Sequence, residues 1–219
     1  MREPSLVAAH MLFDASRLFP KALQESIQKK FKAGPQTSEM LIEYLSGDAH
    51  IGLCSIPEFD SHHLWQMDLT TGESVGTLPE ALCEAQDILA KTKPDRAAAV
   101  CGKLARLCAD GFLFLNTISF DEWSVIAYRF VENISVYISD MPFIWDQITK
   151  GDKYEPQICF TNVTAAKMTL NEHRQSAVNI ANAYLKGNGW PVAKEEAARR
   201  YNNATNLLVD TVLTSLEKK

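Results

Sequence analysis

The chain has 219 residues, 46% of them hydrophobic, which is enough to bury a sizeable core in one large domain or two small ones. Charged residues make up 22%, and glycine and proline together number 19, so the composition indicates neither a disordered nor a fibrous protein. The formal net charge of −5 disfavours nucleic acid or an anionic membrane as the main partner.

Helical periodicity dominates the first third of the chain. Apolar spacing predicts a helix over residues 5–18, ended by Pro20, and a second helix over 21–32. Thr37 and Ser38 open a short helix to Leu45. Residues 47–78 are irregular, with at most a small β-hairpin near 63–78 that turns at Thr71-Gly72.

The remaining two thirds also predict helices. Pro79 and Pro94 open helices over 79–92 and 94–110, the second ended by Gly111, and the short links favour antiparallel neighbours. Further helices are expected at 121–141, 143–150, 163–186 and 192–216, while 112–120 is ambiguous between strand and buried helix. We therefore predict a mainly α fold. It would be a compact, irregular bundle of eight or nine helices in a single domain over 1–219, with sub-units 1–78 and 79–219.

The five cysteines indicate the cellular compartment. They are an odd number without a CxxC pair: Cys54, Cys83, Cys101, Cys108 and Cys159. Cys101 and Cys108 share a helix face with Leu104 and Leu107, as small buried hydrophobic residues do. The N-terminus lacks the pattern of a signal peptide, and no apolar run is long enough to span a membrane. We expect a cytoplasmic protein with reduced thiols.

One segment near the C-terminus resembles a known repeat. Residues 177–205 match at Ala177, Tyr184, Gly187, Gly189, Ala197, Ala198, Tyr201 and Ala204. This pattern resembles one unit of the Sel-like repeats, relatives of the tetratricopeptide repeat. The resemblance implies two closely crossing helices joined by a glycine turn, as in protein-binding scaffolds. Ile180-Ala181 and Trp190 depart from the family pattern, and no second copy is visible, although a repeat needs neighbours to bury its face.

Charge is unevenly distributed. From Ala33 to Ala90 the chain has no Lys or Arg but ten acidic residues: Glu39, Glu43, Asp48, Glu58, Asp60, Asp68, Glu73, Glu80, Glu84 and Asp87. The rest of the chain is net basic. Such a one-signed segment repels itself unless a basic face offsets it. That face could lie within the fold, for example at Lys29, Lys30 and Lys32, or it could belong to a partner protein.

Histidines and carboxylates in the same region are candidate metal ligands. Asp48 and His50, and likewise Asp60 and His62, are spaced two apart, so in an extended loop each pair points the same way. His10 and Asp14, four apart on the first helix, could join this set, as could His63. Imidazole and carboxylate ligands suit a single divalent transition metal, whose bound water would be the nucleophile. Glu58 or Asp60 would then act as general base.

A second family likeness concerns these ligands. The order of His10, Asp48 and His62 is similar to the first three ligands of the zinc-dependent phospholipase C and nuclease group. The later HxxxD and HxxxE motifs of that group are missing, since only His173 follows His63, so at most one metal could be held. No P-loop, dinucleotide, serine-hydrolase or zincin motif occurs either.

The charge gap and the missing catalytic motifs favour a non-enzymatic protein-binding module without a cofactor: an inhibitor, immunity-type protein or complex subunit. Its acidic surface would engage a basic protein through Asp68, Glu73, Glu80, Glu84 and Asp87. A metal-dependent hydrolase using His10, Asp48, His50, Asp60 and His62 is the alternative. A helical-repeat scaffold is a second alternative.

Overall fold

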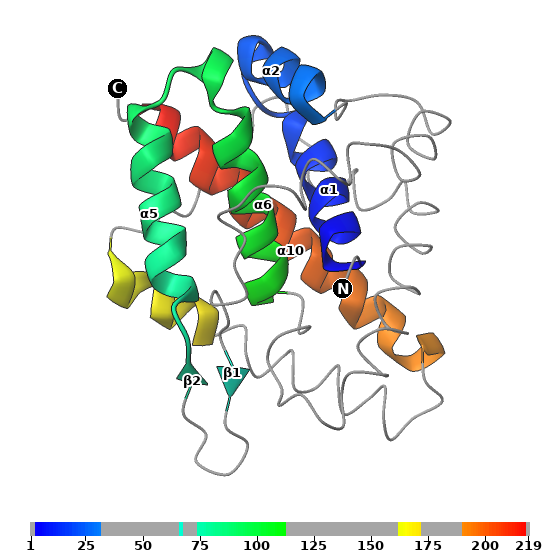
Figure 1. Cartoon of the computed structure of the whole chain (residues 1–219). Helices are drawn as coiled ribbons and strands as arrows, with labels where there is room; N and C mark the ends of the chain where they lie inside the picture. Colours follow the sequence, from blue (N-terminus) through cyan, green and yellow to red (C-terminus); the bar gives the residue numbers. More distant parts are fainter. Residues whose placement is uncertain (1–2, 32–65, 68–73, 113–161, 172–189, 218–219) are drawn as a thin grey trace.

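The computed structural model describes residues 3–31, 66–67, 74–112, 162–171 and 190–217 (Figure 1). These residues form α1 (Glu3–Ser16), α2 (Lys21–Phe31), β1 (Gln66–Met67), β2 (Ser74–Val75), α5 (Leu78–Lys91), the 3₁₀ turn η1 (Pro94–Arg96), α6 (Ala98–Phe112), a helix over 163–171 and α10 (Trp190–Glu217). The predicted mainly α fold is confirmed for this part of the chain. The helices expected at 37–45, 121–141 and 143–150 lie outside the described residues, as do 113–120 and 172–186.

The helices pack in two layers. Helix α6 contacts α1 on one side and α5 on the other, so the three form one layer. Helix α10 contacts all three and runs obliquely across them (Figure 1). No helix in the described residues is both long enough and apolar enough to cross a bilayer.

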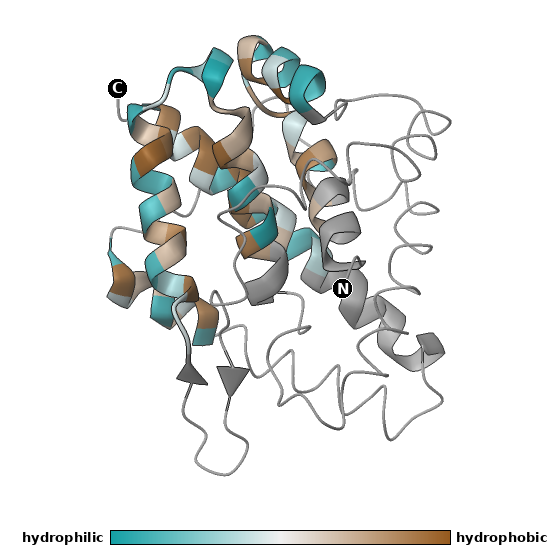
Figure 2. Cartoon of the chain, in the orientation of Figure 1, coloured by the Kyte–Doolittle hydropathy of each residue, from teal (hydrophilic) through white to brown (hydrophobic). Residues whose placement is uncertain are grey.

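Helix α10 is the central element of the core. From residue 201 to 212 every side chain is buried except those of Asn203 and Asn206, which are half-buried. A helix buried on nearly all sides needs no single apolar face. Apolar side chains from the three contacting helices complete the core, and Figure 2 shows hydrophobic and hydrophilic residues alternating along the outer helices. The fully buried members include Met11, Leu12, Leu82, Leu89, Leu104, Leu107, Leu208 and Val212.

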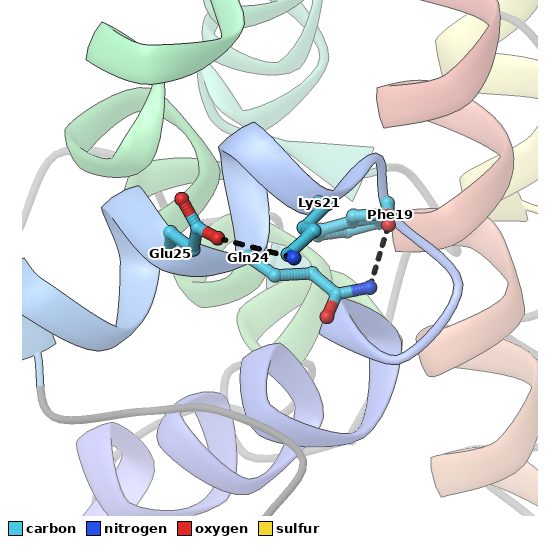
Figure 3. Close-up of polar contacts among 4 residues, drawn as sticks. All are labelled: Phe19, Lys21, Gln24 and Glu25. Atoms are coloured by element: carbon cyan, nitrogen blue, oxygen red, sulfur yellow. Dashed lines mark hydrogen bonds and ion pairs between the residues drawn. The ribbon is translucent and has the colours of Figure 1, made fainter.

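Helix α1 ends in a tight turn that reverses the chain into α2. The amides of Leu18 and Phe19 donate to carbonyls three residues back, at 3.0 and 3.1 Å, so the predicted end at Leu18 is a 3₁₀ extension of α1. The Gln24 side-chain amide donates to the Phe19 carbonyl at 2.7 Å, and the exposed pair Lys21–Glu25 is 4.0 Å apart (Figure 3). These local contacts explain why α2 begins as predicted, directly after Pro20.

Helices α5 and α6 form the predicted antiparallel hairpin (Figure 1). Pro79 lies in the first turn of α5, as expected. The prediction that Pro94 opens the next α-helix is wrong. Pro94 instead begins η1, where the Ser26 hydroxyl of α2 donates to the Asp95 carbonyl at 2.8 Å, and α6 starts four residues later. Gly111 lies inside α6 and does not end it.

The two short strands pair antiparallel, with Gln66 opposite Val75 and Met67 opposite Ser74. This pairing falls within the segment 63–78 for which a hairpin is predicted, while the turn itself lies outside the described residues. Gly76 follows β2 with φ at 147°, a value that favours glycine, and the chain then enters α5.

Candidate functional site

The outer face of α5 carries three of the five predicted partner-binding acids. Glu80, Glu84 and Asp87 are exposed, and their spacing of four and three places them on one side of the helix. We call these three residues the α5 acidic face. The opposite side buries Leu78, Leu82, Ala85 and Leu89 against the bundle, which is why the acids point outward. Asp68 and Glu73 lie outside the described residues.

One of these acids is neutralised by the fold. The Lys167 ammonium lies 3.3 Å from the Glu80 carboxylate, and both side chains are nearly half exposed. Lys29, predicted as an internal counter-charge, is exposed on α2, and Lys32 lies outside the described residues. Within the described part of the chain neither Glu84 nor Asp87 forms an ion pair. Two negative charges of the α5 acidic face therefore remain facing water.

Two large hydrophobic side chains are exposed among the described residues. Ile88 on α5 is 41% exposed and Met168 on helix 163–171 is 61% exposed. Ile88 follows Asp87 directly and lies one turn beyond Glu84. The Thr92 hydroxyl donates to the Ile88 carbonyl at 2.7 Å. This hydrogen bond satisfies a carbonyl in the last turn of α5, the turn that carries the Ile88 side chain. An apolar side chain thus lies beside the two unpaired carboxylates.

The predicted metal ligands are not brought together in the part of the structure that can be described. His10 falls within α1, whereas Asp48, His50, Glu58, Asp60, His62 and His63 lie outside the described residues. No group of three or more His, Cys, Asp or Glu side chains able to hold a metal occurs within the described ranges. The metal site and the general base therefore stay predictions.

Asp14, proposed from the sequence as a further ligand, makes a different contact. Its carboxyl group is buried, and the Tyr201 hydroxyl donates to Oδ2 at 2.6 Å. The Tyr201 side chain is itself completely buried in α10. The bond joins residues 187 apart in sequence and fastens α1 to the central helix.

Burial dominates the electrostatics of this pair. It raises the pKa of Asp14 to about 7, against the opposing effects of the Tyr201 hydrogen bond and the Arg17 charge. Burial, reinforced by the neighbouring carboxyl, also raises the pKa of Tyr201 well above its usual value. The Arg17 guanidinium lies 5.4 Å from the centre of the Phe13 ring, at the edge of the site. The chemical property that distinguishes this pair is a buried carboxyl group whose pKa lies near neutrality.

Sequence reasoning noticed Asp14 but missed its partner. The signal was an acidic residue within the apolar run MLFDA, where residues 11–16 all prove to be buried. Tyr201 was noted only as a match to the Sel-like pattern. Of the other matches, Ala204 is buried in α10, Ala197 and Ala198 fall within α10, and Ala177, Tyr184, Gly187 and Gly189 lie outside the described residues.

The prediction that Cys101 and Cys108 are buried on one helix face is confirmed. Both are fully buried, together with Leu104 and Leu107, on α6. Burial raises the pKa of the Cys101 thiol to about 12, so this thiol stays protonated and unreactive at neutral pH.

Comparison with known protein families, curated proteins and solved structures finds no match to this chain. Function must therefore be argued from the residues themselves.

Proposed function

We propose that this chain is a protein-binding module, an inhibitor, immunity-type protein or complex subunit, that engages a basic surface of another protein. The observation that carries the proposal is the outer side of α5, where Glu84 and Asp87 face water without an ion pair among the described residues and Ile88 is exposed beside them. Asp68 and Glu73, which precede α5 in the chain, would extend the same negative charge.

The combination of charge and apolar surface supports binding better than either alone. Exposed carboxylates attract a basic partner over roughly 10 Å at about 0.1 M salt, and farther at lower salt, and they set orientation more than final affinity. An apolar side chain beside such charges can contribute a water-excluding contact that helps to hold the complex. The Glu80–Lys167 ion pair ties helix 163–171 to α5 and supports a fixed shape for this surface.

Photo-crosslinking can identify the partner. A photo-crosslinking amino acid would replace Ile88 in the full chain, with a matched chain carrying it at Gln28, an exposed position on α2. We expect position 88, but not position 28, to capture one basic protein. Equal capture at both positions would contradict the proposal.

The affinity for the purified partner then tests the charges. The double variant Glu84→Lys and Asp87→Lys would be compared with Glu25→Lys and Glu217→Lys, which alter net charge equally at exposed sites on α2 and α10. Because each exposed ion pair contributes up to about 1 kcal/mol, we expect roughly tenfold weaker binding at low salt for the α5 variant alone. The difference should shrink at 0.5 M salt, about where screening becomes strong. Equal weakening by both double variants would contradict the proposal, because net charge and not the α5 acidic face would then determine the affinity.

A further inference from the structure

The hydrogen bond between Asp14 and Tyr201 fastens the first helix to the last across the core. The Asp14 carboxyl group is almost inaccessible to water, and the Tyr201 hydroxyl is the donor that the structure supplies to Oδ2 of Asp14. The neighbouring Ser16 hydroxyl is directed elsewhere, donating to the Phe13 carbonyl at 2.7 Å. A carboxylate in this position would exchange the many hydrogen bonds of water for very few from the protein.

The charged surroundings do not compensate such a carboxylate fully. Arg17, in the turn directly after α1, is the cation that favours its ionised form. The helices packed against α1 carry these other described titratable or charged side chains: Lys21, Glu25, Lys29 and Lys30 on α2, Cys101, Lys103, Arg106 and Cys108 on α6, and Tyr201, Asp210 and Glu217 on α10. Of these, only Tyr201 acts on the pKa of Asp14. Among the described side chains, Tyr201 and Arg17 are therefore the two that stabilise the ionised form, and the effect of burial outweighs them.

We propose that the Asp14–Tyr201 pair is a pH-sensitive contact that holds α1 against α10 more firmly while the carboxyl group is protonated than when it is ionised, so that release of α1 becomes easier as the pH rises. Release would expose the buried side of α1, which includes Ala8, Met11, Leu12 and Ala15. This inference does not depend on the proposed protein-binding function, because it concerns a different face of the molecule.

Hydrogen exchange followed by mass spectrometry tests this contact in the full chain between pH 5 and pH 8. Exchange of α1 and α5 peptides would be corrected for the intrinsic pH dependence of amide exchange. Opening transfers Asp14 to water, where its pKa returns toward 3.8, so protection of α1 should fall about tenfold per pH unit up to about pH 7 and then level off. Release of α1 alone costs less free energy than unfolding of the whole protein, so protection of α1 should stay below that of α5, which packs on α6 and α10, at every pH.

Three variants separate a titrating contact from a merely structural one. Asp14→Asn keeps an acceptor for Tyr201 but cannot ionise, so protection of α1 should become independent of pH. Tyr201→Phe and Arg17→Met each remove a group that favours the carboxylate, so the levelling-off should move above pH 7. Arg17→Lys keeps the charge and should behave like the native chain.

Two results would overturn the proposal. One is a pH dependence of α1 protection in Asp14→Asn that matches that of the native chain. If Asp14→Asn does not fold, the same match in both Tyr201→Phe and Arg17→Met would overturn the proposal. The other is equal protection of α1 and α5 at every pH, because α1 would then open only when the whole protein unfolds.

Discussion

Replacing Asp14 by asparagine changes one buried group with little change in shape. The asparagine carbonyl can still accept the Tyr201 hydroxyl, while the charge that forms above neutral pH is lost. The substitution therefore isolates the cost of ionising a carboxyl group inside the bundle. We predict that Asp14→Asn stabilises the protein at pH 8 and has much less effect at pH 5.

The magnitude follows from the difference between the folded and unfolded states. The pKa of Asp14 rises from 3.8 to about 7 on folding, so the folded state holds a proton that the unfolded state releases between these values. Folding stability is therefore greatest below about pH 4 and falls as the pH rises to about 7. At about 1.4 kcal/mol per pKa unit, the full loss is about 4 kcal/mol, and more than half of it falls between pH 5 and pH 8.

Urea unfolding followed by circular dichroism at pH 5, 6, 7 and 8 measures this loss. The native chain and Asp14→Asn should differ by an amount that grows with pH and is constant above about pH 7.5, since the carboxyl group is then ionised in both states. Asp87→Asn is the matched control, because it makes the same chemical change at an exposed site on α5. If the two curves for native chain and Asp14→Asn run parallel in pH, the buried carboxyl group does not titrate as argued.

Three further predictions concern the core, the surface and the metal site. Leu208→Ala should lower the free energy of unfolding by about 2 to 5 kcal/mol in the same urea assay, because Leu208 is fully buried in α10; a loss under 1 kcal/mol would contradict its central position. Lys167→Met should cost no more than about 1 kcal/mol, since its pair with Glu80 is half exposed, and the cost should vanish at 1 M salt; a larger, salt-independent loss would indicate a packing role. A chelator should leave the melting temperature unchanged under the protein-binding proposal; one equivalent of zinc lost in His50→Ala and His62→Ala would instead establish the metal site.

Several local features could be predicted because neighbouring residues decide them. Pro20 restricts the backbone wherever it occurs, so the boundary before α2 could be placed from the sequence. The seven-residue spacing of Cys101 and Cys108 predicts a shared buried face on any helix. The acidic side of α5 could be expected for the same reason, since helical spacing alone separates Glu84 and Asp87 from Leu82 and Leu89.

Other features could not be predicted because they depend on distant contacts. Pro94 begins a 3₁₀ turn rather than α6, and that turn accepts a hydrogen bond from Ser26, nearly seventy residues earlier. Apolar spacing predicts the helix over residues 5–18 but not the burial of every residue from 11 to 16, which follows because α1 packs against both α6 and α10. The ion pair between Lys167 and Glu80 also joins segments that the sequence could not place together.

By itself, the sequence determined the helical class, the start of α2, the α5–α6 hairpin and the exposure of the α5 acidic face, because periodicity and proline act over one or two turns. Only the tertiary structure decided the environment of Asp14. A carboxyl group in an apolar run may face water, a metal or a buried hydroxyl, and its pKa depends on which of these surrounds it. Tyr201 lies 187 residues away in the sequence, and only the packing of α1 on α10 brings its hydroxyl to the Asp14 carboxyl group.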